Sequence, residues 1–139
     1  MANVVVSLTF LTAALDEIYM YGSMYLKLFC NDYTPDQDME PGDFTEAAGG
    51  GYALKSVEST TDFTQEYDNT PPDIIMAEQT FTFTGVLTTN PTVYGWFLTS
   101  EDLSLIVAAK ELDAPYTPAS GGGTLKFTPR IQAGNGTPE

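Results

Sequence analysis

The sequence predicts a mainly β protein, an antiparallel β-sandwich of jelly-roll-like arrangement with one short N-terminal helix. Three observations predict this fold class. Beyond Gly22, apolar and polar residues alternate with period two through most runs. These runs are rich in Tyr, Phe, Val, Ile and Thr, which suit a pleated, half-buried surface. Turns rich in Gly and Pro separate the runs, and no helical segment between them is long enough for a parallel crossover.

A single apolar stripe predicts the N-terminal helix, over about residues 7–21. Ser7 suits the N-cap, and Gly22 suits the stop at the other end. The members of the stripe recur at the spacing of three or four residues that one helix face requires: Leu8, Leu11, Leu15 and Ile18.

The expected strands follow the helix. Leu103–Leu112 also fits a short buried helix, but its brevity and its position between two strand-like runs favour a strand. We expect the sandwich to span about 24–131, residues 133–139 to form a flexible tail, and the whole chain, 1–139, to be a single domain. The strand candidates are Tyr25–Cys30, Tyr52–Val57, Thr80–Thr84, Thr92–Thr99, Leu103–Lys110 and Thr124–Ile131.

Composition excludes several classes of function. The chain has 19 acidic and 5 basic side chains and a formal charge of −14, which argues against nucleic-acid binding. It has no His and one Cys, so it lacks the commonest general base and cannot form an internal disulfide or a Cys-based zinc site. We therefore expect no enzyme, no catalytic residues and no cofactor. The apolar run Val4–Leu15 is too short to cross a bilayer and lacks a basic start, so we expect neither membrane attachment nor a signal peptide.

An acidic loop is the sharpest candidate for an ion site, because six carboxylates fall within 15 residues, from Asp32 to Glu46. The EF-hand spacing fails, since Pro41 stands where that loop needs glycine and Ala47 where it needs the bidentate glutamate. We expect a solvated loop without a metal. If calcium did bind, its ligands would come from Asp36, Asp38, Glu40 and Asp43.

Other residues could form interfaces. Tyr94 and Trp96 lie close together in an aromatic run, and burial in a core or interface competes with a surface platform for sugar rings. At the N-terminus, Asn3, Val4, Val5 and Val6 are candidates for an arm onto a neighbouring subunit. Cys30 shares the face of Leu26 and Leu28, which indicates a small buried apolar residue rather than a nucleophile.

Several runs, in order, resemble a group of small structural proteins of tailed-bacteriophage virions. The resemblance covers about residues 8–131. Two loops depart from it: Ser100-Glu101-Asp102 replaces an expected glycine turn, and the acidic loop is richer in carboxylates. The matching runs are Tyr25–Pro35, Asp43–Ala47, Gly51–Ala53, Gln79–Gly85, Thr92–Phe97 and Gly123–Pro129.

The resemblance implies a head-associated β-sandwich protein, by analogy a capsid decoration or cement protein, often trimeric. Its expected partners are the major capsid protein or other virion subunits, and its expected location is the virion, after assembly in the host cytoplasm. Two alternatives stay open: a neck, tail or fibre-attachment protein, and a carbohydrate-binding sandwich module for host recognition. The resemblance carries no catalytic residues.

Overall fold

The computed structural model describes residues 22–36, 38–66, 73–101 and 105–132. The predicted helix over 7–21, the candidate arm Asn3–Val6 and the predicted tail 133–139 lie outside this part of the chain. The described residues divide into two compact units. Of these residues, the larger unit holds 23–36, 38–57, 80–101 and 105–127, and the smaller holds 22, 58–66, 73–79 and 128–132. A single domain over 1–139 stays a prediction.

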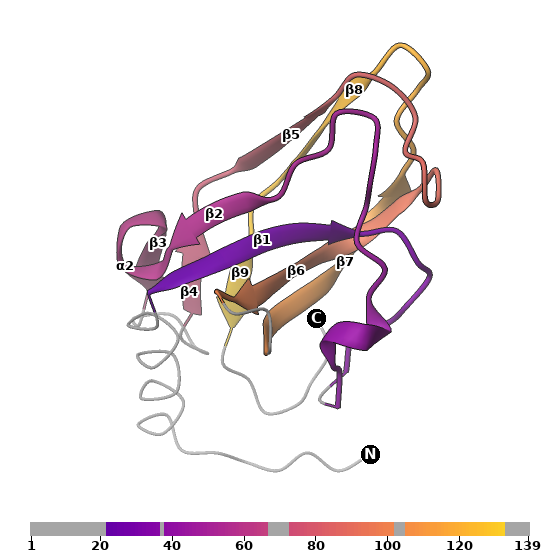
Figure 1. The fold of residues 1–139 in the computed structure, drawn as a ribbon. Coiled ribbons are helices and arrows are strands. Elements are labelled where there is room, and N and C mark those ends of the chain that lie inside the picture. The colour runs from indigo at the N-terminus through magenta and orange to yellow at the C-terminus, as the bar shows by residue number, and fades with distance from the viewer. Residues whose placement is uncertain (1–21, 37, 67–72, 102–104, 133–139) are drawn as a thin grey trace. The chain divides into compact units, whose positions relative to one another are not determined.

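A four-stranded sheet forms the frame of the larger unit, with strand order β2-β1-β6-β7 (Figure 1). The β1–β6 and β6–β7 pairs are antiparallel, and β1 places Leu28 opposite Trp96. The β6–β7 register shifts twice, which marks bulges or irregularities in that pair. The bounds of these strands are Ser23–Phe29 for β1, Lys55–Glu58 for β2, Val93–Ser100 for β6 and Ile106–Tyr116 for β7.

The larger unit has two further elements. Strands β5, Gln79–Phe83, and β8, Gly123–Phe127, form a two-stranded sheet. A short 3₁₀ helix, η1, Pro41–Asp43, lies in the acidic loop between β1 and β2. The larger unit, with the loop that contains η1, carries all the candidate side chains that the structure describes.

Strands β1 and β6 form the core of the larger unit because both are central in their sheet. Every residue of β6 except Tyr94 is buried. Gly95 makes this packing possible, since a Cβ there would collide with the Lys110 carbonyl oxygen and the Phe29 ring. Next to Gly95, Phe29, Phe44 and Phe97 form an aromatic cluster in which Phe44 stacks on Phe97 with ring centroids 4.6 Å apart.

The smaller unit has a three-stranded antiparallel sheet with strand order β3-β4-β9. A single helical turn, α2, precedes β3, and the Asp62 carboxylate accepts a hydrogen bond from the Glu58 backbone N–H at 2.7 Å. Phe63, Ile74 and Met76 are its buried apolar residues. The bounds are Ser59–Asp62 for α2, Phe63–Glu66 for β3, Asp73–Met76 for β4 and Arg130–Gln132 for β9.

The predicted class is confirmed at the level of a mainly β protein with antiparallel sheets. The ambiguous run Leu103–Leu112 is a strand from Ile106 onward, and it extends to Tyr116. The predicted strand Thr124–Ile131 is wrong as one element. It divides into β8 and β9 around Pro129, which has no N–H to donate to a ladder.

Candidate functional site

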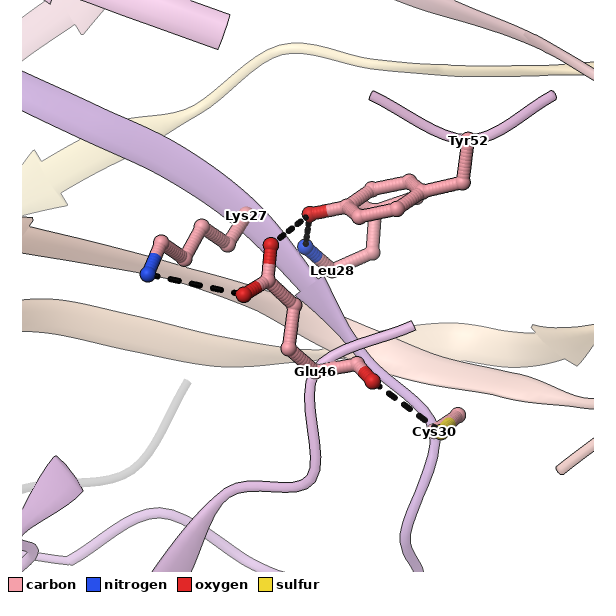
Figure 2. A network of polar contacts seen from close by, with 5 residues as sticks. All are labelled: Lys27, Leu28, Cys30, Glu46 and Tyr52. Carbon is pink, nitrogen blue, oxygen red and sulfur yellow. Dashed lines mark hydrogen bonds and ion pairs between the residues drawn. The ribbon is translucent and has the colours of Figure 1, made fainter. Parts of the chain in front are cut away.

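A polar network joins strand β1 to the loop that precedes β2 (Figure 2). The Lys27 ammonium lies 3.5 Å from one carboxylate oxygen of Glu46. The Tyr52 hydroxyl donates a hydrogen bond of 2.8 Å to the other carboxylate oxygen, and accepts one of 3.2 Å from the Leu28 backbone N–H. The network therefore fixes Glu46, the last acid of the loop, against the C-terminal part of β1.

Backbone contacts extend this attachment along β1. The Cys30 N–H donates to the Thr45 carbonyl oxygen at 2.8 Å, and the Ala47 N–H donates to the Leu28 carbonyl oxygen at 2.9 Å. The loop thus follows β1 as a short antiparallel bridge, with Phe29 opposite Glu46. Both backbone and side-chain hydrogen bonds therefore hold the loop against β1.

Lys27 is buried, with 7% of its surface exposed, although it is charged. Its ammonium lies 5.9 Å from the centroid of the Phe97 ring, which attracts a cation through its negative face. The Glu46 carboxylate supplies the opposite charge and stays partly exposed. A buried charge is tolerated only where such partners replace water, so the loop and β1 stabilise each other.

Burial raises the pKa of the Tyr52 hydroxyl well above its usual range. The hydrogen bond from the Leu28 N–H opposes this rise in pKa, whereas the negative charge of Glu46 adds to it. The hydroxyl therefore keeps its proton at neutral pH and acts as a hydrogen-bond donor. The hydroxyl therefore has a structural role, because it donates a hydrogen bond to the carboxylate that holds the loop.

Cys30 follows the last residue of β1 and is fully buried, as the sequence predicts. Burial raises the pKa of its thiol, and its sulfur lies 3.8 Å from the Glu46 backbone oxygen. A thiol whose charged form is disfavoured is a poor nucleophile. Cys30 therefore belongs to the packing around the network.

The acidic loop uses its carboxylates to shape its own backbone. Asp36 accepts a hydrogen bond of 2.8 Å from the Asp38 N–H, and Asp43 accepts one of 2.9 Å from the Glu40 N–H. Asn31, near the start of the loop, is bonded to η1 near its end, since the Asn31 side-chain amide donates to the Asp43 backbone oxygen at 2.8 Å. Bonds of this kind are typical of a turn built by short acidic side chains.

The four calcium candidates, Asp36, Asp38, Glu40 and Asp43, are exposed. Within residues 22–36, 38–66, 73–101 and 105–132, no group of three or more acidic or Cys side chains is arranged to hold a metal ion. The structure brings these residues into one loop, but the contacts that it shows are hydrogen bonds within that loop.

The two aromatic interface candidates have different surroundings. Trp96 is 3% exposed and stacks on Phe127, with ring centroids 6.1 Å apart and planes 5° from parallel. Tyr94 is partly buried and packs against the aromatic cluster of Phe29, Phe44 and Phe97. The burial of Trp96 counts against a sugar platform at this residue. The remaining candidates, Asn3, Val4, Val5 and Val6, lie outside the described residues.

Trp96 begins a column of stacked rings that sequence patterns did not indicate. Phe127 stacks in turn on Phe81 at 5.8 Å, and Phe81 stacks on Tyr52 at 6.1 Å. The column ends at the Tyr52 hydroxyl, so it connects the central strand β6 to the polar network. The sequence predicted strands around Phe81 and Phe127, but not that their rings would stack on each other.

Three loops meet at one end of the larger unit, at the upper right of Figure 1, and we name this region the tip. It consists of residues 48–51, 84–89 and 118–122. The Thr84 N–H donates to the Gly50 carbonyl oxygen and the Thr88 N–H to the Ala48 carbonyl oxygen, each at 2.8 Å. The sequence predicts turns rich in Gly and Pro between the strands, but the meeting of these three loops depends on contacts between distant segments.

Two glycines make this close approach possible. Gly50 has a φ of +59°, and a Cβ on it would lie 2.5 Å from the Gly85 carbonyl oxygen. Gly122 has a φ of +95°, and a Cβ there would collide with the Phe83 carbonyl oxygen. Any other residue at either position would strain the backbone and separate the loops.

No family model, curated protein or solved structure matches this chain. In the part of the chain that the structure describes, no helix has the length and apolar character to span a membrane.

Proposed function

We propose that this chain is a non-enzymatic structural protein of a bacteriophage virion. Its role is that of a capsid decoration or cement subunit, which binds the outside of the head and stabilises neighbouring capsid subunits. The proposal includes the finer fold, a jelly-roll-like β-sandwich over about 24–131, and a homotrimer as the associating species. The ordered resemblance of six runs to small virion proteins supports this assignment.

One observation carries the proposal: the side chains that could serve catalysis are bonded to one another and hold the fold together. Lys27, Glu46, Tyr52 and Cys30 all carry groups that could serve chemistry, and the structure joins them in one network that holds a loop on β1. A rigid frame of this kind favours a subunit that acts by burying surface, because ordering a loop upon binding would weaken association.

The charge of the chain supports the same role. At −14, free copies repel each other and stay soluble before assembly. The same charge steers the subunit toward basic patches on a capsid shell and away from DNA. Attraction of this type weakens as salt is added, because the Debye length falls from about 10 Å at 0.1 M to about 3 Å at 1 M.

Co-sedimentation of the full chain with emptied capsid shells of the phage that encodes it tests the proposal. We expect the chain to sediment with the shells at low ionic strength and to be released as NaCl is raised. Binding to isolated tails or necks instead of shells would overturn the head assignment. Absence from every virion fraction would overturn the structural role itself.

A matched pair of variants tests the contribution of charge. Asp32→Asn and Asp38→Asn together neutralise two exposed acids of the acidic loop, whereas Glu101→Gln and Asp113→Asn neutralise two exposed acids elsewhere in the larger unit. If the acidic loop faces the shell, the first pair weakens shell binding more than the second. Equal effects would mean that net charge alone attracts the chain to the shell.

A further inference from the structure

The tip, residues 48–51, 84–89 and 118–122, has no charged side chain, although the chain as a whole carries −14. The absence of charge continues along the flanking sequence, since residues 79–100 and 114–125 also contain no Asp, Glu, Lys or Arg. Most of the tip is exposed. The protein therefore presents a neutral surface that three separate segments build together.

Val86 lies on this surface as an exposed apolar side chain, with 51% of its area accessible. Exposed threonines, among them Thr84, Thr88 and Thr89, surround it in sequence. The absence of charge is a feature that the tip shares with interface cores, where charged residues are depleted. It can be covered without removing a charge from water, which is costly.

The tip is also fixed before any partner arrives. The loop at 48–51 is bonded to the loop at 84–89 by two backbone hydrogen bonds of 2.8 Å, and the Thr88 hydroxyl adds a third to the Ala48 carbonyl oxygen at 3.1 Å. At Gly50 and Gly122 the backbones approach so closely that no side chain would fit between them. Little conformational entropy is lost when such a surface is covered.

From these observations we infer that the tip is the surface through which copies of this chain contact one another. The argument for a second copy as the occupant is electrostatic. Two copies repel wherever acidic surface meets acidic surface, and like charges brought together cost several kcal/mol. The tip lets two copies touch over surface that adds no such repulsion. The inference rests on the proposed function only for its biological meaning, which is a homo-oligomer on the shell. Its test measures self-association of the purified chain and does not require shells.

The tip is smaller than a standard interface, which has about 20–30 residues on each side. We therefore expect self-association to be weak and to depend on concentration. Added salt screens the repulsion between the remaining acidic surfaces, so self-association strengthens as NaCl is raised. This sign is opposite to that of shell binding, which weakens with salt. The two processes are thus distinguishable in one titration.

Sedimentation velocity of the full chain, without shells, tests the inference across protein concentration at low and high NaCl. We expect the average mass to rise with concentration, and to rise further at high salt. Val86→Asp puts a carboxylate on the tip and is expected to weaken association at least about tenfold. Leu105→Asp is the matched control, because it makes the same change at an exposed apolar residue outside the tip.

Ser120→Asp gives a second test at an exposed tip residue, for use if Val86→Asp does not fold as judged by circular dichroism. The inference is overturned if the wild-type chain stays monomeric at every concentration and salt. It is also overturned if the tip variants and Leu105→Asp weaken association equally. A chain that stays monomeric would also remove the homotrimer from the proposed function. The binding of the chain to shells is measured separately, and its loss would overturn the assignment to the head.

Discussion

Replacing Tyr52 by phenylalanine removes one oxygen atom from the centre of the polar network. The ring that stacks on Phe81 is kept, so the aromatic column is preserved. Two hydrogen bonds are lost, one from the Leu28 N–H and one to the Glu46 carboxylate. Leu28 is fully buried, so its N–H loses the acceptor that the hydroxyl provides on that side of β1.

The expected cost follows from the burial of each lost bond. A buried donor without an acceptor costs about 1–3 kcal/mol, whereas a partly exposed carboxylate regains water and contributes little. We expect a loss of about 2 kcal/mol in the free energy of unfolding. With an unfolding entropy of about 2.1 cal/mol/K per residue, this loss lowers the melting temperature of the 139-residue chain by about 7 °C.

Thermal unfolding followed by circular dichroism measures this change. Tyr25→Phe is the matched control, since it removes a hydroxyl from a partly exposed tyrosine on the same strand. The control should melt close to the wild-type protein. An unchanged melting temperature for Tyr52→Phe, or an equal loss in the control, would show that the hydroxyl does not hold the loop to β1.

Three further predictions follow from single contacts. Burial raises the folded-state pKa of Tyr52 above its ordinary value of about 10, so stability is complete below that pH and falls above it, where only the unfolded chain loses the proton. Urea unfolding across this range should show the fall, and Tyr52→Phe should reduce it. Gly50→Ala should cost about 1–3 kcal/mol in the same assay, whereas Gly42→Ala, at a site with open space, should cost little. The buried Cys30 thiol should react with a thiol reagent far more slowly in the native protein than in urea, and equal rates would contradict its burial.

The strand frame was largely predictable because it depends on local alternation. Leu26 and Leu28 share a face of β1 by period two, and both are fully buried. The same alternation places Lys27 on the opposite face, where a charged residue is expected to meet water. Lys27 is buried because a loop from beyond Pro41 covers it and brings Glu46 to its ammonium. No local pattern encodes that contact.

Short strands and contacts between distant segments were not predictable for a related reason. Strands β3 and β4 are four residues each, too short for a period to be recognised. At the candidate site, the run of six acids from Asp32 to Glu46 identified the acidic loop, but no pattern indicated the partners of Glu46. Tyr52 lies six residues further on and Lys27 lies in a different strand, so only the folded chain joins them.

The thermal stability of the virion itself tests the central claim most directly. In this experiment, particles of the phage to which the proposed function assigns this chain are stripped of it, divided, and either left bare or supplied again with the purified chain. Genome release is then followed on heating with a DNA-binding dye. A cement subunit predicts that bare particles release DNA at a lower temperature and that the added chain restores the original value. Equal release temperatures for bare and reconstituted particles would contradict the claim.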